Sequence, residues 1–276
     1  MTYQNILLYP NQRRPVNKED FEKVATLLHG MGYTLFTTDP TFVTDEIHYL
    51  PAETAFSKCD AAIVLGGDGT MLGAASRARL AGTPLLGINF GTLGYMTELE
   101  ISECHLLAKL GQARIEERML LDVTAEGEDV PPSTITALNE AVISHAAPGE
   151  MIRLRLFCDG NEVCSYRGDG MIISTPTGSS AYNLSVGGPI IDPKMNAFCV
   201  APMAPHTLAA MRPLIFSPDS VLQVEIEGDA NVTADSQLFP LLKGKSKLTV
   251  KRSGDTLKLL KLKNAGFYEA LMKKLT

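Results

Sequence analysis

The stretch Asp60-Ala-Ala-Ile-Val-Leu-Gly-Gly-Asp-Gly-Thr70-Met-Leu72 decides how this chain folds. Its apolar run, Ala61 to Leu65, is too short for a helix and predicts a strand buried on both faces. From Thr70 onward the apolar residues recur at helical spacing. Three glycines lie between the two patterns and let the backbone turn sharply. We therefore predict a strand, a glycine turn and a helix.

A turn of this kind suits phosphate binding. Glycines leave the backbone amides open to a ligand, and the N-terminus of a helix adds partial positive charge. Gly66, Gly67, Gly69 and Thr70 are therefore predicted to bind the phosphates of a donor. Asp68 is an anion at an anion site, and phosphoryl transfer uses such a carboxylate as a base or to hold magnesium. The alternative is an ordinary corner in which Asp68 or Thr70 caps the helix.

The first part of the chain alternates strand and helix patterns. Short apolar runs precede and follow a helix that begins after the N-cap Asn17, and a further strand, Pro84 to Ile88, follows the helix at Thr70. We predict an α/β domain with a parallel sheet over residues 1–112, closed by a helix from Ser102 to Leu110. Ligands bind such sheets at the carboxyl ends of the strands, where the loop from Asn89 to Tyr95 also lies.

The sequence pattern changes from Arg114 onward. β-Branched residues and a period of two predict a β-rich, sandwich-like domain over residues 113–264. One of its predicted strands is continuous from Ile135 to His145, and a short helix capped near Ser179 is expected further on. The last segment, residues 265–276, predicts a helix that packs back on the first domain.

Composition excludes several classes of function. The 276 residues hold 25 Lys plus Arg against 31 Asp plus Glu, a net charge of -6, so no nucleic-acid partner is expected. The five cysteines form no C-x-x-C pair and suit reduced thiols. The N-terminus does not resemble a signal peptide, and no apolar stretch reaches the roughly 20 residues that cross a bilayer. We expect a soluble cytoplasmic protein with no membrane partner.

Two polar stretches interrupt the second half. Asn139 and Glu140 stand in an otherwise apolar strand, where a buried pair must be hydrogen-bonded and could face ribose hydroxyls, unless the strand lies at a solvent edge. The run Tyr166-Arg-Gly-Asp-Gly-Met-Ile-Ile-Ser-Thr-Pro-Thr-Gly-Ser-Ser-Ala-Tyr-Asn-Leu-Ser185 is rich in hydroxyls and glycines. Together with Asp169 these groups suit a polyhydroxylated nucleotide. A serine-rich turn with a helix cap is the alternative.

Other motifs are missing. The sequence has no G-x-x-x-x-G-K-[ST] phosphate loop and no H-E-x-x-H zinc motif, and its five histidines show no metal-ligand spacing. We predict no metal site built from protein side chains alone.

In combination, the motifs resemble those of the NAD kinase family. They are Leu65-Gly-Gly-Asp-Gly-Thr70, Leu138-Asn-Glu140, the run from Arg167 to Pro189 and Ala201-Pro-Met-Ala-Pro-His206, in the family's order. The resemblance runs from about Asn5 to Tyr268. It differs at Asp235-Ser236-Gln237, because the family usually has glycine where Ser236 stands, which makes a contact from Gln237 less secure.

This resemblance implies a two-domain kinase with its active site between the domains, which phosphorylates the 2′-hydroxyl of the adenosine ribose of NAD to give NADP. Asp68 would be the general base, and Tyr95 would lie beside the adenine. ATP or polyphosphate would be the donor, with Mg²⁺ as cofactor, and the subunits would form a homodimer or homotetramer. The NAD site would comprise Asp68, Gly69, Tyr95, Asn139, Glu140, Arg167, Asp169, Ser180, Ala181, Tyr182, Asn183, Leu184, Ser185, Ala204 and Gln237.

Three other functions remain as alternatives. A lipid kinase shares the glycine turn but is expected to have Glu where Gly73 stands. A dinucleotide sensor without catalysis has no need of Asp68 among phosphate-binding glycines. A dehydrogenase would need G-x-G-x-x-G after the first strand, and Tyr9-Pro-Asn-Gln12 lacks it.

Overall fold

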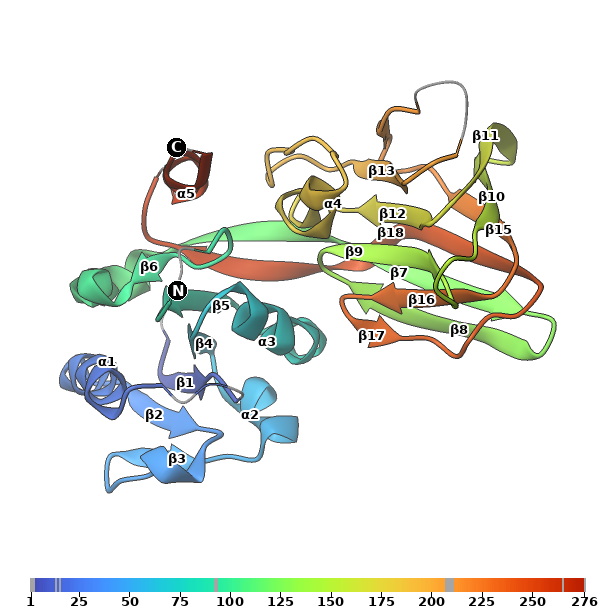
Figure 1. Ribbon diagram of the computed structural model, residues 1–276. Coiled ribbons are helices and arrows are strands. Elements are labelled where there is room, and N and C mark those ends of the chain that lie inside the picture. The colour runs from blue at the N-terminus through green and yellow to red at the C-terminus, as the bar shows by residue number, and fades with distance from the viewer. Residues whose placement is uncertain are drawn as a thin grey trace. The chain divides into compact units, whose positions relative to one another are not determined.

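The computed structural model describes residues 3–12, 14, 16–91, 94–206, 211–264 and 266–275 (Figure 1). The chain divides into two compact units. The first comprises residues 1–117 and 257–276, and the second comprises residues 118–256.

The first unit contains a parallel sheet in the order β3-β2-β1-β4-β5. The direction of strand order reverses between β1 and β4, and ligands bind α/β sheets beyond the carboxyl ends of strands at such a point. At the far edge, β5 pairs with β6 and, through Leu85 and Leu259, with the end of β18. The strands are β1 (Asn5–Pro10), β2 (Thr34–Thr37), β3 (Ile47–Tyr49), β4 (Ala61–Leu65), β5 (Leu85–Asn89) and β6 (Leu99–Glu100).

Helices cover both faces of this sheet. Figure 1 shows α1 on one side, where it contacts η2, and α2 with α3 on the other. Asn17 caps α1 as predicted, because its side chain accepts a hydrogen bond from the amide of Glu19 at 2.9 Å. The helices are α1 (Lys18–Gly30), η1 (Pro40–Phe42), α2 (Ala52–Lys58), α3 (Asp68–Ala81), η2 (Ile101–Gln112) and α5 (Gly266–Leu275).

The strand Ala61–Leu65 is confirmed, and all five of its residues are buried. Three other predictions for this unit need correction. Helix α3 begins at Asp68, so Asp68 and Gly69 belong to its first turn. The segment from Ser102 to Leu110 is a 3-10 helix rather than an α-helix. Both α2 and β3 were missed in a stretch that has no clear period.

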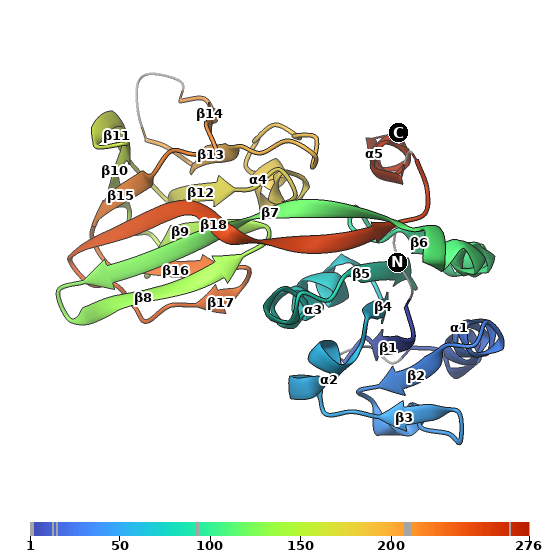
Figure 2. The same ribbon diagram turned by 180° about the vertical axis from the view of Figure 1, so that it is seen from behind.

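The second unit is a sandwich of two antiparallel layers. One layer contains β11, β10, β15, β18, β7 and β8, and Figure 2 shows the β7–β8 hairpin beside β18. The other has the order β14-β13-β12-β9-β16-β17. Inward side chains of both layers form one apolar core, in which Leu154 and Val224 from the first layer join Ile143 and Ile173 from the second.

The bounds of these elements are β7 (Arg114–Gly127), β8 (Val130–Ala137), β9 (Glu140–His145), β10 (Ile152–Cys158), β11 (Asn161–Gly168), β12 (Gly170–Ser174), η3 (Gly178–Ser180), α4 (Tyr182–Ser185), β13 (Phe198–Met203), β14 (Leu214–Phe216), β15 (Leu222–Glu227), β16 (Ala230–Ala234), β17 (Gln237–Leu238) and β18 (Lys245–Lys261). The predicted strand from Ile135 to His145 is two strands, because the chain turns at Leu138 and Asn139. Two strands predicted at 247–251 and 257–262 are one, β18. The strands β13, β14, β16 and β17 were not predicted.

Candidate active site

The glycine turn joins β4 to α3 in the first unit. Gly67 is the N-cap of α3 and supplies no side-chain cap, so the alternative in which Asp68 or Thr70 caps this helix is wrong. The first amides of an uncapped helix have no partner within the helix and can bind an anion. Thr70 is 8% exposed, and its Oγ1 has no hydrogen-bond partner within the described residues. A β-carbon on Gly66 would overlap that hydroxyl, so glycine is required there.

The carboxylate of Asp68 is held by the loop that follows β5. Its Oδ2 accepts a hydrogen bond from the amide of Tyr95 at 2.7 Å, and its Oδ1 accepts one from the amide of Met96 at 2.9 Å. A side chain on Gly94 would overlap Oδ1. Each oxygen keeps lone-pair capacity for a further hydrogen bond, since an ionised carboxylate accepts about four.

Tyr95, predicted to lie beside the adenine, is half-buried in the first unit. Its ring centroid lies 6.1 Å from that of Phe267 on α5, in a tilted arrangement. Burial and the neighbouring Asp68 carboxylate raise the pKa of Tyr95. The phenol therefore stays a neutral hydrogen-bonding group.

In the second unit, Asn139 and Glu140 lie at the turn between β8 and β9 rather than inside one strand. Asp235 holds this turn, because its carboxylate accepts hydrogen bonds from the amides of Asn139 at 2.8 Å and Glu140 at 3.3 Å, and from that of Leu138. From the other side, the amide of Thr175 donates to the carbonyl of Asn139 at 2.8 Å. The polar turn is therefore fixed by its own neighbours.

The side chain of Glu140 lies in an unusual electrostatic environment. Burial, together with the like charge of Asp235, raises its pKa to about 7. Its Oε2 is buried and has no hydrogen-bond partner among the described residues. Burial also raises the pKa of Asp235, against the lowering effect of its three amide donors. A carboxylate left without a partner is available to a hydroxyl of a ligand.

Asp235 and Ser236 form the two-residue turn between β16 and β17. Ala234 pairs with Gln237, so the loop contains only these two residues. Their φ angles are 48° and 66°. Two positive φ values in a two-residue hairpin loop match a type I′ turn, which favours glycine at its second position. Ser236 therefore adopts a backbone conformation that glycine adopts without strain.

The hydroxyl-rich run packs against the turn at Asn139. A β-carbon on Gly178 would overlap the backbone of Asn139. Ser179 does not cap a helix as predicted, because its hydroxyl donates to the carbonyl of Pro176 at 2.6 Å and accepts from the amide of Ile191 at 2.9 Å. Asn183 is fully buried, and its amide donates to the carbonyls of Ser179 and Pro189. These residues shape the run around the site.

A hollow of about 400 Å³ in the second unit brings three predicted residues together, since Asp169, Ser185 and Ala204 all line it. Ala204 has a φ of 42°, which is rare for a residue with a side chain. Such backbone strain clusters at ligand sites. A β-carbon on Gly168 would lie 2.9 Å from the carbonyl of Ala204, so the two segments approach closely.

The other predicted residues of this unit reach the surface to different degrees. Arg167, Tyr182, Leu184 and Gln237 are exposed, and Ser180 and Ala181 are partly buried. The structure thus groups Asn139 and Glu140 with residues 175–178, and Asp169 with Ser185 and Ala204.

Sequence reasoning missed Gly94, Thr175 and the role of Asp235 in holding the turn at Asn139. Gly94 stood within a loop already noted for its glycines, Thr175 within the hydroxyl-rich run and Asp235 beside the departure at Ser236, but no sequence pattern indicated the contacts that they make.

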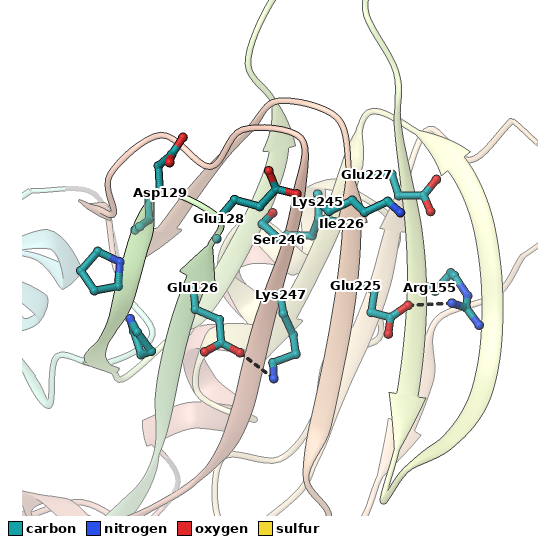
Figure 3. Close-up of a pocket in the computed structure, with 14 residues that line it drawn as sticks. Glu126, Glu128, Asp129, Arg155, Glu225, Ile226, Glu227, Lys245, Ser246 and Lys247 are labelled. Carbon is teal, nitrogen blue, oxygen red and sulfur yellow. Dashed lines mark hydrogen bonds and ion pairs between the residues drawn. The ribbon is translucent and has the colours of Figure 1, made fainter.

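A larger hollow of about 830 Å³ in the second unit contains none of the predicted residues (Figure 3). Its charged groups pair across adjacent strands, as in the contact of Arg155 with Glu225 at 2.7 Å. Such pairs are ordinary on an exposed sheet face. We place the site at the smaller hollow and the turn at Asn139 instead.

No group of three or more His, Cys, Asp or Glu side chains among the described residues is arranged to hold a metal ion. None of the helices in the described part of the chain is long and apolar enough to span a membrane.

The family profile "ATP-NAD kinase N-terminal domain" matches residues 11–111, and "ATP-NAD kinase C-terminal domain" matches residues 138–262. These matches give the class of protein, a phosphotransferase with an alcohol group as acceptor. The chain belongs to the NAD kinase family.

Individual relatives agree with this family. An NAD kinase of Caldanaerobacter subterraneus subsp. tengcongensis is 38% identical over 84% of this chain and 83% of its own. An NAD kinase of Lachnoclostridium phytofermentans is 34% identical over 96% of each chain.

Solved structures show the same fold. Yeast NADH kinase complexed with NADH has a TM-score of 0.87 at 22% identity, over 99% of this chain and 87% of its own. An NAD kinase from Archaeoglobus fulgidus in complex with ATP has a TM-score of 0.75 at 24% identity, over 98% of both chains.

Proposed function

We propose that this protein transfers the γ-phosphoryl group of ATP to the 2′-hydroxyl of the adenosine ribose of NAD, with Asp68 as general base. The observation that carries this assignment is the carboxylate of Asp68, which lies within a glycine turn at the start of α3 and is held by two backbone amides. A carboxylate so close to free helix amides repels the phosphate that those amides would bind. Its presence there is explained if the carboxylate takes part in the transfer.

The donor binds at the glycine turn. The amides of Gly67 and Gly69 and the hydroxyl of Thr70, whose Oγ1 has no partner in the described chain, hold its phosphates. The prediction for Gly66 needs correction, because its amide already donates to the carbonyl of Ile88 at 2.9 Å. NAD kinases of the family include one solved with ATP. Polyphosphate presents the same terminal phosphoryl group, so we propose it as a second donor.

NAD binds to the polar turns of the second unit. The unpartnered Oε2 of Glu140 accepts a hydrogen bond from a ribose hydroxyl, and the lining of the smaller hollow supplies further contacts. The residues proposed for this site are Asp68, Gly69, Tyr95, Asn139, Glu140, Arg167, Asp169, the segment Ser180 to Ser185, Ala204 and Gln237.

Mg²⁺ fits this residue set only as a companion of the donor. The described residues offer no cluster of three metal-binding side chains, and Mg²⁺ in kinases is held largely by phosphates and water with one or two carboxylates. Asp68, whose oxygens each accept one amide, is the carboxylate that would contribute. The ion would neutralise charge on the phosphates.

The chemistry requires little covalent help from the protein. Asp68 accepts the proton of the 2′-hydroxyl, whose oxygen attacks the γ-phosphorus while the bond to the β-phosphate oxygen breaks and ADP leaves. Positioning and charge neutralisation provide most of the rate enhancement in such reactions. The amides of Tyr95 and Met96 keep the carboxylate oriented during the transfer.

The decisive experiment compares wild type with Asp68→Asn. The purified proteins are incubated with NAD, Mg²⁺ and either ATP or polyphosphate, and NADP is measured with an NADP-specific dehydrogenase. We expect NAD binding within a few fold of wild type and a kcat lower by about 100-fold or more, in line with the loss of a general base. Wild-type turnover in the variant would remove Asp68 from this role.

The same preparations test the remaining alternatives. NAD binding without any NADP formation by wild type would favour a dinucleotide sensor. Phosphorylation of diacylglycerol in vesicles would favour a lipid kinase. We also propose a homodimer or homotetramer, and light scattering of the purified protein gives the mass that decides it.

A further inference from the structure

We infer that Glu98 is a positioning residue, which holds the Asp68 carboxylate in its reactive orientation by anchoring the loop that binds it. The inference rests on the proposed role of Asp68 as the base. It concerns the residues from Gly94 to Glu98 and the segment 261–263, all in the first unit.

The loop touches Asp68 through its backbone alone. The two amides that bind the carboxylate belong to Tyr95 and Met96, at 2.7 Å and 2.9 Å. Main-chain donors can orient a carboxylate only if the loop itself is fixed. A shift of about 1 Å in such a contact can cost up to about 100-fold in rate.

Glu98 fixes this loop at its far end. Its own amide donates to the carbonyl of Gly87 on β5 at 2.9 Å, which ties the backbone to the sheet. Its side chain is only 3% exposed and crosses to the end of β18. There Oε1 accepts hydrogen bonds from the amides of Leu262 at 2.7 Å and Lys263 at 2.6 Å.

Lys261 completes the anchor. Its Nζ lies 2.7 Å from Oε2 of Glu98, and the two side chains are 11% and 2% exposed. A buried carboxylate with two amide donors and a largely buried counter-ion holds one geometry, because moving it would leave charged groups unpaired. Met96 is only two residues from Glu98, so the backbone between this anchor and the amides of Tyr95 and Met96 has little freedom to move.

Glu103, which lies in η2 and pairs with the same C-terminal segment, provides a matched control. Its carboxylate pairs with the Nζ of Lys263 at 2.9 Å and accepts from the amide of Glu100 at 2.9 Å. Glu103→Gln therefore removes a carboxylate and a lysine contact of the same kind, whereas among the described residues Glu103 makes no hydrogen bond or ion pair with residues 94–98. A general loss of stability would affect both variants alike.

The test is a double-mutant comparison of Glu98→Gln in the wild-type and Asp68→Asn backgrounds. In wild type we expect Glu98→Gln to lower kcat by about 10-fold with KM for NAD within about 2-fold, because only the base is misplaced. In Asp68→Asn it should cause no further fall, since the misplaced group is already absent. Glu103→Gln should leave kcat within about 2-fold in both backgrounds.

A second readout does not depend on activity. The amide NMR signals of Tyr95 and Met96 should shift on Asp68→Asn, because both amides donate to that carboxylate. Glu98→Gln should weaken this response, whereas Glu103→Gln should keep it. If Glu98→Gln folds poorly, Lys261→Gln, which leaves the two backbone contacts of Glu98 in place, undergoes the same measurements.

The outcomes separate the two ideas. Wild-type kcat in Glu98→Gln, or an equal fall in both backgrounds, would overturn the positioning role while Asp68 keeps its own. If wild type forms no NADP, the proposed function fails, and the amide response alone decides: a weakened response supports the anchor and an unchanged one refutes it.

Discussion

The α-carbon of Gly94 faces the carboxylate of Asp68 so closely that a β-carbon would overlap its Oδ1. Gly94 does not adopt a positive φ, so space rather than backbone conformation demands glycine here. The group in the way is the end of a side chain that can rotate. A side chain at position 94 would therefore displace the Asp68 carboxylate without breaking the fold.

Gly94→Ala should lower kcat by about 10-fold to 100-fold with little change in the stability of the protein, because Asp68 is displaced from its orientation. Steady-state NADP formation and thermal unfolding give the two values. Gly91→Ala is the control, since nothing lies within 4 Å of a β-carbon there. Equal activities of the two variants would mean that Asp68 needs no such space.

Glu140 makes stability depend on pH. Its pKa in the folded protein is raised to about 7. The contribution of Glu140 to the free energy of unfolding is therefore largest below the pKa that this side chain has in the unfolded chain, and it is lost as the pH rises through 7. Glu140→Gln removes this loss and should be more stable than wild type by roughly 1–3 kcal/mol at about pH 8, with no difference near pH 4.

Urea unfolding of the ligand-free proteins at both pH values tests this prediction. The exposed Glu150→Gln serves as control and should follow wild type at both. A Glu140→Gln protein that is less stable than wild type at the higher pH would show that the ionised side chain stabilises the fold.

Ser236 has a φ of 66°, in the left-handed region where a residue with a side chain is strained. Ser236→Gly should stabilise the protein by about 0.5–1 kcal/mol, because the relief of strain exceeds the extra entropy of glycine in the unfolded chain. Ser165→Gly on the exposed edge of β11, where no positive φ occurs, should instead destabilise it. Thermal unfolding of both variants measures the difference, and the same sign for both would contradict the prediction.

Gly178→Ala places a methyl group against the backbone of Asn139, which cannot rotate away as a side chain can. We expect the turn at Asn139 to move, KM for NAD to rise by about 10-fold or more and stability to fall by about 1–3 kcal/mol. Gly254→Ala, in the same unit, meets nothing within 4 Å and is the control. NAD titration by calorimetry separates the binding loss from any loss of kcat.

The parts of the fold that could be predicted are those with a strong local pattern. The buried strand Ala61–Leu65, the cap at Asn17 and the class of each unit follow from period and capping chemistry. The turn at Leu138 and Asn139 could not be predicted, because the residue that stabilises it, Asp235, lies almost a hundred positions later. Likewise, the need for glycine at position 94 arises only once α3 and the loop meet.

The candidate site also divides into a part that the sequence predicts and a part that it does not. Motifs identified Asp68 and the polar turns, but the partners that orient them are backbone amides, which every residue type has and no sequence pattern distinguishes. The departure at Ser236 was visible in the sequence. Its cost in backbone conformation required coordinates.

The first unit is completed by residues 257–276. In the order of the chain, Asp68 precedes the second unit, whereas Lys261 and the amides that bind the Glu98 carboxylate follow it. Domains generally fold as units as they emerge during synthesis. The second unit, residues 118–256, is therefore synthesised in full before the contacts that anchor the Asp68 loop through Glu98 can form.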